Sequence, residues 1–225
     1  MLKEVCKVTK GARMQRRPAK LTILNAFVEL LQETDFDKIT VRTLCQRADI
    51  ARSTFYMHFS DIYEVIQTLE DGLIAAFKKV DAEAARQHRT PGGKRTDWGL
   101  TLDPPYPFYE WFEVCLDNWD ALRAMLGPHG DRYFVAKFRR VLTDHVNFMM
   151  DADEMPRDEL RHGFNEAMVE CHFILLSNWL LHENTSLTAQ NIAIILNSMR
   201  IGGNTLGHYT GGEDGMPPHS ERWLE

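Results

Sequence analysis

The stretch LCQRADIARSTFYMHF, from Leu44 to Phe59, decides how the fold of this chain is interpreted. Its apolar residues are too scattered for a β-strand, yet it contains two adjacent aromatic pairs, Phe55-Tyr56 and His58-Phe59. On a helical wheel of about 100° per residue, Phe55 and Phe59 share one face. The stretch is therefore either an ordinary buried turn or an outward-facing binding element held on a small core.

The residues around this stretch predict two short helices joined by a tight turn. Thr40 is a good N-cap for a first helix that begins at Val41, and a second helix is expected from about Arg52 to His58. Asp49 lies in the turn, where Asp tolerates a left-handed backbone better than most residues do. The face opposite the packing offers hydrogen-bond donors and no acidic group: Arg52, Ser53, Thr54, Tyr56 and His58.

An outward face of this kind suits nucleic acid, because phosphates and base edges accept hydrogen bonds. A helix-turn-helix protein places the N-terminal part of its second helix in the major groove. The charge distribution agrees: residues 1–60 hold eleven Lys and Arg against six Asp and Glu, and the remainder holds fifteen against twenty-six. We expect the basic N-terminal part to approach a polyanion. Chance variation in charge, and two packed helices with an ordinary polar exterior, stay open as alternatives.

The rest of the chain is predicted to be helical from its apolar periodicity. No segment alternates with the period of a strand. The class expected is therefore all-α, with about nine helices. Outside the two short helices, the helical segments expected are 18–33, 60–80, 108–126, 131–150, 157–181 and 188–201, with an interruption rich in Pro and Gly at 90–107.

Composition excludes several classes of protein. The chain has 225 residues, 44% of them apolar, and no apolar run approaches the roughly 18 residues that span a bilayer. Its basic start lacks the apolar core of a signal peptide. The four cysteines lie far apart, which fits reduced thiols better than disulfides or a zinc site. We expect a cytoplasmic protein with no membrane partner.

The segment ITVRTLCQRADIARSTFYMHFSDIYEV, residues 39–65, resembles the TetR (tetracycline repressor) family. The motif resemblance covers about residues 17–70, and the remainder resembles the family only in its helix pattern. The segment 111–138 looks like one C-terminal type of the family, with a Leu-Gly-Pro-x-Gly turn between two helices. The resemblance implies a homodimer with a basic arm (1–16), a three-helix DNA-binding domain (17–60), an all-α regulatory and dimerisation domain (61–206) and a flexible tail (207–225).

The resemblance also implies roles on DNA. Thr40 caps its helix and touches phosphate, Arg42 lies near the DNA backbone, and Lys20 and the arm residue Arg17 add backbone or minor-groove contacts. The recognition helix opens with Arg52, Ser53 and Thr54, and Tyr56 and His58 contact phosphate or sugar.

Three positions depart from the family pattern. The family usually has Gly where Asp49 stands, Ser where Ala51 stands, and often a phosphate-binding Lys where Ile62 stands. A missing cap costs about 1 kcal/mol, and a missing phosphate contact lowers the salt dependence by about one unit of slope. We expect a weaker and more salt-tolerant DNA-binding protein than the motif alone suggests.

Aromatic side chains gather between residues 106 and 138, and such residues line both protein cores and ligand pockets. A packed core is the simpler interpretation. The alternative is a pocket for a small hydrophobic or aromatic effector, with His145 or His172 as its polar anchor. The other residues expected to line that pocket are Trp111, Cys115, Trp119 and Phe134.

The last two long helices are apolar over more than one face. Such a helix needs a second partner, and a symmetric dimer supplies one; burial in a single-chain core is the alternative. The residues expected at the dimer interface are Phe164, Met168, Cys171, Leu175, Trp179, Ile192, Ile195 and Met199.

The function expected is a DNA-binding transcriptional regulator, a repressor that a small-molecule effector releases from a double-stranded DNA operator. The nine histidines lack metal-ligand spacing, and no catalytic motif occurs, so no metal, cofactor or enzymatic activity is expected. The alternative is the same fold with a filled pocket, acting through a protein partner as a co-activator or interaction module. A cavity above roughly 300 Å³ favours the first, and a packed interior favours the second.

Overall fold

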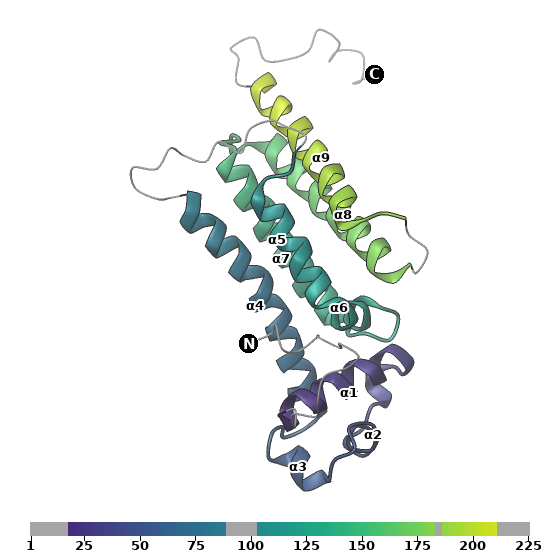
Figure 1. Ribbon diagram of the computed structural model, residues 1–225. Coiled ribbons are helices and arrows are strands. Elements are labelled where there is room, and N and C mark those ends of the chain that lie inside the picture. Colours follow the sequence, from purple (N-terminus) through teal and green to yellow (C-terminus); the bar gives the residue numbers. More distant parts are fainter. Residues whose placement is uncertain (1–17, 89–102, 183–185, 211–225) are drawn as a thin grey trace.

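The computed structural model describes residues 18–88, 103–182 and 186–210, and these form an all-α fold (Figure 1). No β-strand occurs within the described ranges, so the predicted fold class is confirmed. The elements are α1 (Ala19–Glu33), the 3₁₀ turn η2 (Phe36–Lys38), α2 (Val41–Arg47), α3 (Arg52–Tyr56), α4 (Ile62–His88), α5 (Tyr106–Asp117), α6 (Trp119–Leu126), α7 (Arg132–Ala152), α8 (Glu159–Leu181) and α9 (Ala189–Thr210).

Several predictions fall outside the described residues. These are the basic arm, Arg17, most of the 90–107 interruption and the chain after residue 210.

The helices α1 to α3 form a small bundle at one end of the molecule (Figure 1). Phe55 and Phe59 are buried in it, with ring centroids 6.0 Å apart, and Leu44 is fully buried as well. Asp49 adopts a φ of 53° in the turn between α2 and α3, which is the left-handed backbone expected there. The helix-turn-helix predicted from the sequence is therefore present.

Local hydrogen bonds fix where α2 and α4 begin. The Thr40 hydroxyl accepts from the backbone N–H of Thr43 at 3.2 Å, and the Thr43 hydroxyl accepts from that of Thr40 at 3.0 Å. Asp61 caps α4 by accepting from the Glu64 N–H at 2.8 Å, and the Glu64 carboxylate accepts from the Ser60 N–H at 2.6 Å. These contacts with the Ser60 N–H and hydroxyl hold the pKa of Glu64 below its usual range.

The long helix α4 belongs to both halves of the molecule. Its first turns pack on α1, and its later turns pack on α5 and α7. Its buried face includes Val65, Leu69 and Phe77, and the Phe77 ring lies 4.3 Å from that of Trp111 between centroids. One continuous helix of 27 residues therefore joins the N-terminal bundle to the body of the subunit.

The observed helices differ from the predicted ones in three places. The helix predicted over 108–126 is two helices, because the buried Asn118 leaves the helical backbone and donates from Nδ2 to the Val114 carbonyl at 2.8 Å. It also starts earlier, at Tyr106, since proline fits the first turn of a helix. α4 continues past Val80 to His88, and α9 continues past Ile201 to Thr210.

A second contact joins the N-terminal bundle to the body of the subunit, at the turn between α6 and α7. His129 Nδ1 lies 2.6 Å from Asp35 Oδ1, and the Phe36 N–H donates to the His129 carbonyl at 3.2 Å. Asp35 also pairs with Lys38 at 2.6 Å. Lys38 first, and His129 second, lower the pKa of Asp35 to about 2.

This contact predicts that part of the free energy of unfolding is lost in acid. The folded-state pKa of Asp35 is about 2, below its ordinary value of 3.8, so its contribution is present above about pH 4 and lost as the pH falls through about 2. We expect the free energy of unfolding of the natural protein to fall more steeply over this window than that of Asp35→Asn, measured by urea unfolding at each pH. Asp37→Asn, at an exposed neighbouring carboxylate, should keep the wild-type slope. Parallel curves for the natural protein and Asp35→Asn would contradict this assignment.

Candidate nucleic-acid interface and the cavity behind it

The outer face of α3 is exposed and rich in hydrogen-bonding groups. Tyr56 has 59% of its surface exposed, and Arg52, Ser53 and His58 are also exposed, whereas Thr54 is half-buried. Because Phe55 and Phe59 hold the opposite face in the core, these side chains lie where a DNA groove could meet them.

The cations of the N-terminal bundle fall into two groups. Arg47 bonds Glu33 at 2.7 Å, and Lys38 bonds Asp35, so both are occupied within the protein. Lys20, Arg42 and Arg52 are exposed and form no ion pair within the described residues. Lys20 Nζ also lies 5.3 Å from the centroid of the Phe59 ring. The charges available to phosphate are therefore on α1, α2 and the first turn of α3.

An open groove runs between α2 and α3 on this same face, lined in part by Arg42, Gln46 and Arg52. Thr40 is exposed beside α2, although its hydroxyl is engaged in the cap. Ala51 gives α3 no side-chain cap, because a methyl group cannot accept a hydrogen bond. Ile62 is only 8% exposed, because its side chain packs into the core. The first residue of α4 therefore presents no charge to this face.

The arrangement defines a class of protein: a helix-turn-helix DNA-binding domain carried on an all-α body. Residues 23–69 match the family model described as bacterial regulatory proteins, tetR family. The fold is similar to the crystal structure of a TetR transcriptional regulator from Streptococcus agalactiae, at 25% identity and a TM-score of 0.50, covering 80% of this chain and 92% of that one. The comparison with curated proteins gives no match. The family match lies within the N-terminal part of the chain, and the two comparisons together support a TetR-family DNA-binding transcriptional regulator.

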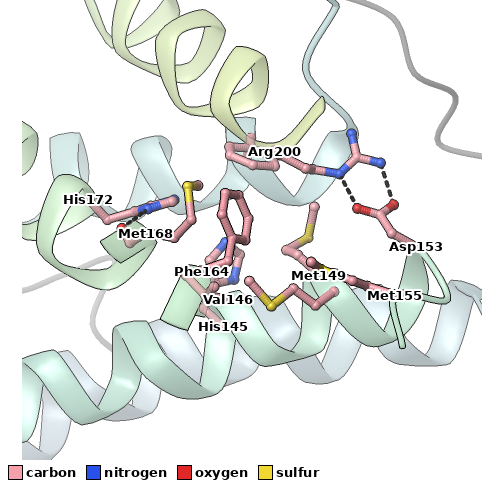
Figure 2. A pocket seen from close by; sticks show the side chains of 11 residues that line it. His145, Val146, Met149, Asp153, Met155, Phe164, Met168, His172 and Arg200 are labelled. Carbon is pink, nitrogen blue, oxygen red and sulfur yellow. Dashed lines mark hydrogen bonds and ion pairs between the residues drawn. The ribbon is translucent and has the colours of Figure 1, made fainter. Parts of the chain in front are cut away.

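Behind the interface, the body of the subunit contains a cavity of only about 20 Å³. It lies among α5, α7, α8 and α9, and its lining is largely methionine and phenylalanine (Figure 2). Of the six residues predicted to line a pocket, His145 and His172 do so. Trp111, Cys115 and Phe134 are buried in the core, and the half-buried Trp119 packs edge-on against Trp179.

Two polar groups lie at opposite ends of the cavity (Figure 2). At one end Arg200 binds the Asp153 carboxylate with contacts of 2.5 and 2.7 Å, and both side chains are buried. At the other end the His172 Nδ1–H donates to the Met168 carbonyl at 2.7 Å. Burial, reinforced by the neighbouring His145, lowers the pKa of His172 to about 4. The sequence offered no signal for the Arg200–Asp153 pair, whose members lie on separate elements.

A polar contact also joins the wall of the cavity to α4. Asp81 of α4 accepts from the indole N–H of Trp111 at 3.1 Å and from His145 Nδ1 at 2.7 Å. The His145 and Trp111 rings are in contact and tilted by 35°, with centroids 4.5 Å apart. His145 is 2% exposed, so this network lies inside the subunit and connects α4, α5 and α7.

The residues predicted at a dimer interface fall into three groups. Met168, Trp179 and Ile192 are covered by their own chain and present no outer surface. Ile195 is exposed, and four are half-buried: Phe164, Cys171, Leu175 and Met199. Sequence reasoning missed four exposed residues on α8 that form one row with the half-buried Cys171, although their spacing of three and four residues could have revealed them: Leu160, Gly163, Ala167 and Ile174.

No helix in the described ranges has the length and hydropathy that a membrane crossing requires. Among the same residues, no three His, Cys, Asp or Glu side chains gather as metal ligands would.

The interface predicts a contrast between two neighbouring arginines. Arg52→Ala should weaken binding to a specific DNA duplex by roughly tenfold or more and lower the salt slope by about one, because an unpaired guanidinium is lost from the DNA-facing side. Arg47→Ala removes an arginine already bound to Glu33, so it should leave DNA affinity within about twofold. Fluorescence anisotropy over a salt series measures both. Equal losses in the two variants would place the interface elsewhere.

Proposed function

We propose that the protein is a homodimeric repressor that leaves its operator when an effector binds the body of the subunit. The observation that carries this proposal is the path of α4. The helix begins just after the recognition helix α3 and passes the cavity, where Asp81 is hydrogen-bonded to the wall residue His145. Movement of the wall therefore has a direct mechanical route to the DNA-binding domain.

The mechanism is a shift between two populations of the dimer. In the operator-binding state, the two α3 helices match half-sites about 34 Å apart, one turn of DNA. An effector that binds better to a state with displaced α4 changes this spacing and lowers DNA affinity. The size of the effect is limited by the difference in the effector's affinity for the two states.

The exposed row on α8 supports the homodimer. Ile174 is 53% exposed and Leu160 is 49% exposed, and small residues lie between them at Gly163 and Ala167. Ile195 of α9, 37% exposed, adds to the same kind of surface. Small and apolar side chains allow two helices to approach closely, and a two-fold axis would cover each row with its copy.

The small cavity favours a second candidate function. A volume of about 20 Å³ holds about one water, far below the roughly 300 Å³ of a typical organic ligand site. The same regulator would then act through a protein partner, as a co-activator or interaction module. An organic effector requires the methionine side chains of the lining to move, and their flexibility makes that movement inexpensive.

Selection of genomic DNA fragments by the purified protein tests the proposed function. We expect enrichment of two-fold symmetric sites, with loss of binding when the low-molecular-mass fraction of a cell extract is added. Loss or gain of binding only with the protein fraction would favour the second candidate. Failure to enrich any sequence would contradict both.

The dimer surface predicts the effect of a buried charge. Ile174→Glu would place a carboxylate in the apolar row, so we expect light scattering at micromolar concentration to give the single-chain mass of 26.0 kDa, against twice that for the natural protein. Tyr133→Glu, at a 77% exposed residue of α7, should leave the dimer intact. A monomeric natural protein would show that α8 and α9 form no stable interface.

A further inference from the structure

Four buried side chains on α7 and α8 form two matched pairs around the cavity. His145 and Met149 are four residues apart on α7, and Met168 and His172 are four residues apart on α8, so each pair shares a helix face. All four line the cavity and are 2–4% exposed. A short turn makes the two helices antiparallel, and the two imidazole rings lie with their centroids 6.5 Å apart.

Both imidazoles have one nitrogen fixed and one available. His145 Nδ1 lies 2.7 Å from the Asp81 carboxylate and His172 Nδ1 lies 2.7 Å from the Met168 carbonyl. These oxygens accept, so each Nδ1 carries the hydrogen and each Nε2 has a lone pair. Neither Nε2 has a hydrogen-bond partner within the described part of the chain. Histidines that bind metals are oriented in this way, by a carboxylate or a carbonyl behind the ring.

The size and chemistry of the cavity limit the kind of ligand that it can hold. Its volume of about 20 Å³ suits a single atom or water. The walls near the four donors are apolar and include Phe108, Val146 and Phe164. Two imidazole nitrogens and two thioether sulfurs are uncharged donors, and the thioethers are soft, so the set favours monovalent copper over hard divalent cations. The Asp81 carboxylate behind His145 partly balances one positive charge.

We propose that His145, Met149, Met168 and His172 bind one soft monovalent metal ion, Cu(I). The long methionine side chains bring their sulfur atoms to the ion by rotation about flexible bonds. His145 would be one of the ligands of the ion, and it is hydrogen-bonded to Asp81 of α4. The ion is then the effector itself, and this last assignment alone rests on the proposed function.

A metal titration tests the site independently of DNA. Cys6→Ser/Cys171→Ser serves as the background, because thiols also bind Cu(I) and the described Cys45 and Cys115 are buried. Cu(I) affinity is measured by competition with bicinchoninate, and Ag(I) serves as a redox-inert probe. We expect one ion per chain. Adding Met149→Leu/Met168→Leu, which conserves volume, should lower the affinity at least thirtyfold, whereas adding Met155→Leu, in the same lining, should change it less than threefold.

The results distinguish the existence of the metal site from its role in releasing DNA. No ion bound by the background protein, or equal affinity in the Met149→Leu/Met168→Leu variant, overturns the site. Methyl NMR gives a second readout: Ag(I) should shift the Met149 and Met168 methyl signals and leave that of Met155 in place. Release of selected DNA by Ag(I) from the background protein, and not from the double leucine variant, supports the effector role. Binding without release overturns that role, while DNA binding by the metal-free protein reports on the proposed function itself.

Discussion

The structure depends on one helix being shared between two hydrophobic cores. The first turns of α4 bury Val65 and Leu69 beside α1, and its later turns bury Leu73 and Phe77 against α5 and α7. A helix cannot slide or rotate in one core without disturbing its packing in the other, because close-packed interiors resist deformation. The position of the DNA-binding domain is therefore tied to the packing of the body.

A chain of ring contacts extends this constraint to the cavity. Phe77 of α4 packs on Trp111, Trp111 packs on His145, and His145 lines the cavity. Asp81, one turn further along α4, adds hydrogen bonds to both Trp111 and His145. At the other end of α4, buried Phe55 and Phe59 determine which face of α3 meets solvent. Packed rings thus determine the exposed face of α3 at one end of α4, and a second set of rings joins α4 to the cavity wall at the other.

Local sequence was sufficient to predict the DNA-binding half. Three features of this half act within a few residues of the chain, so their structural consequences follow from sequence alone. They are the capping hydroxyl of Thr40, the left-handed backbone of Asp49 and the four-residue spacing of Phe55 and Phe59. The resemblance to the TetR family supplied the expectation of a dimer and of residue roles on DNA, and both stay predictions. The break between α5 and α6 at Asn118 was missed, because the apolar pattern continues through it. The buried side-chain amide ends the helix despite that pattern.

The regulatory half depends on contacts between residues far apart in the chain. Trp111, Cys115 and Phe134 were assigned to a pocket, yet they are core residues, because aromatic composition is the same in a core and in a ligand site. Asp81 and His145 are 64 residues apart and meet only through packing of α4 on α7. The four donors around the cavity have no sequence motif for the same reason: two helices contribute one pair each.

We propose that α3 enters DNA while α4 transmits the state of the body to it, and a crystal structure of the protein bound to its selected operator would test both parts. We expect α3 of each subunit in the major groove, with Arg52 and Tyr56 on the DNA, and α4 still hydrogen-bonded to the cavity wall through Asp81. DNA bound to another face, or an α4 detached from the wall in the operator complex, would contradict it.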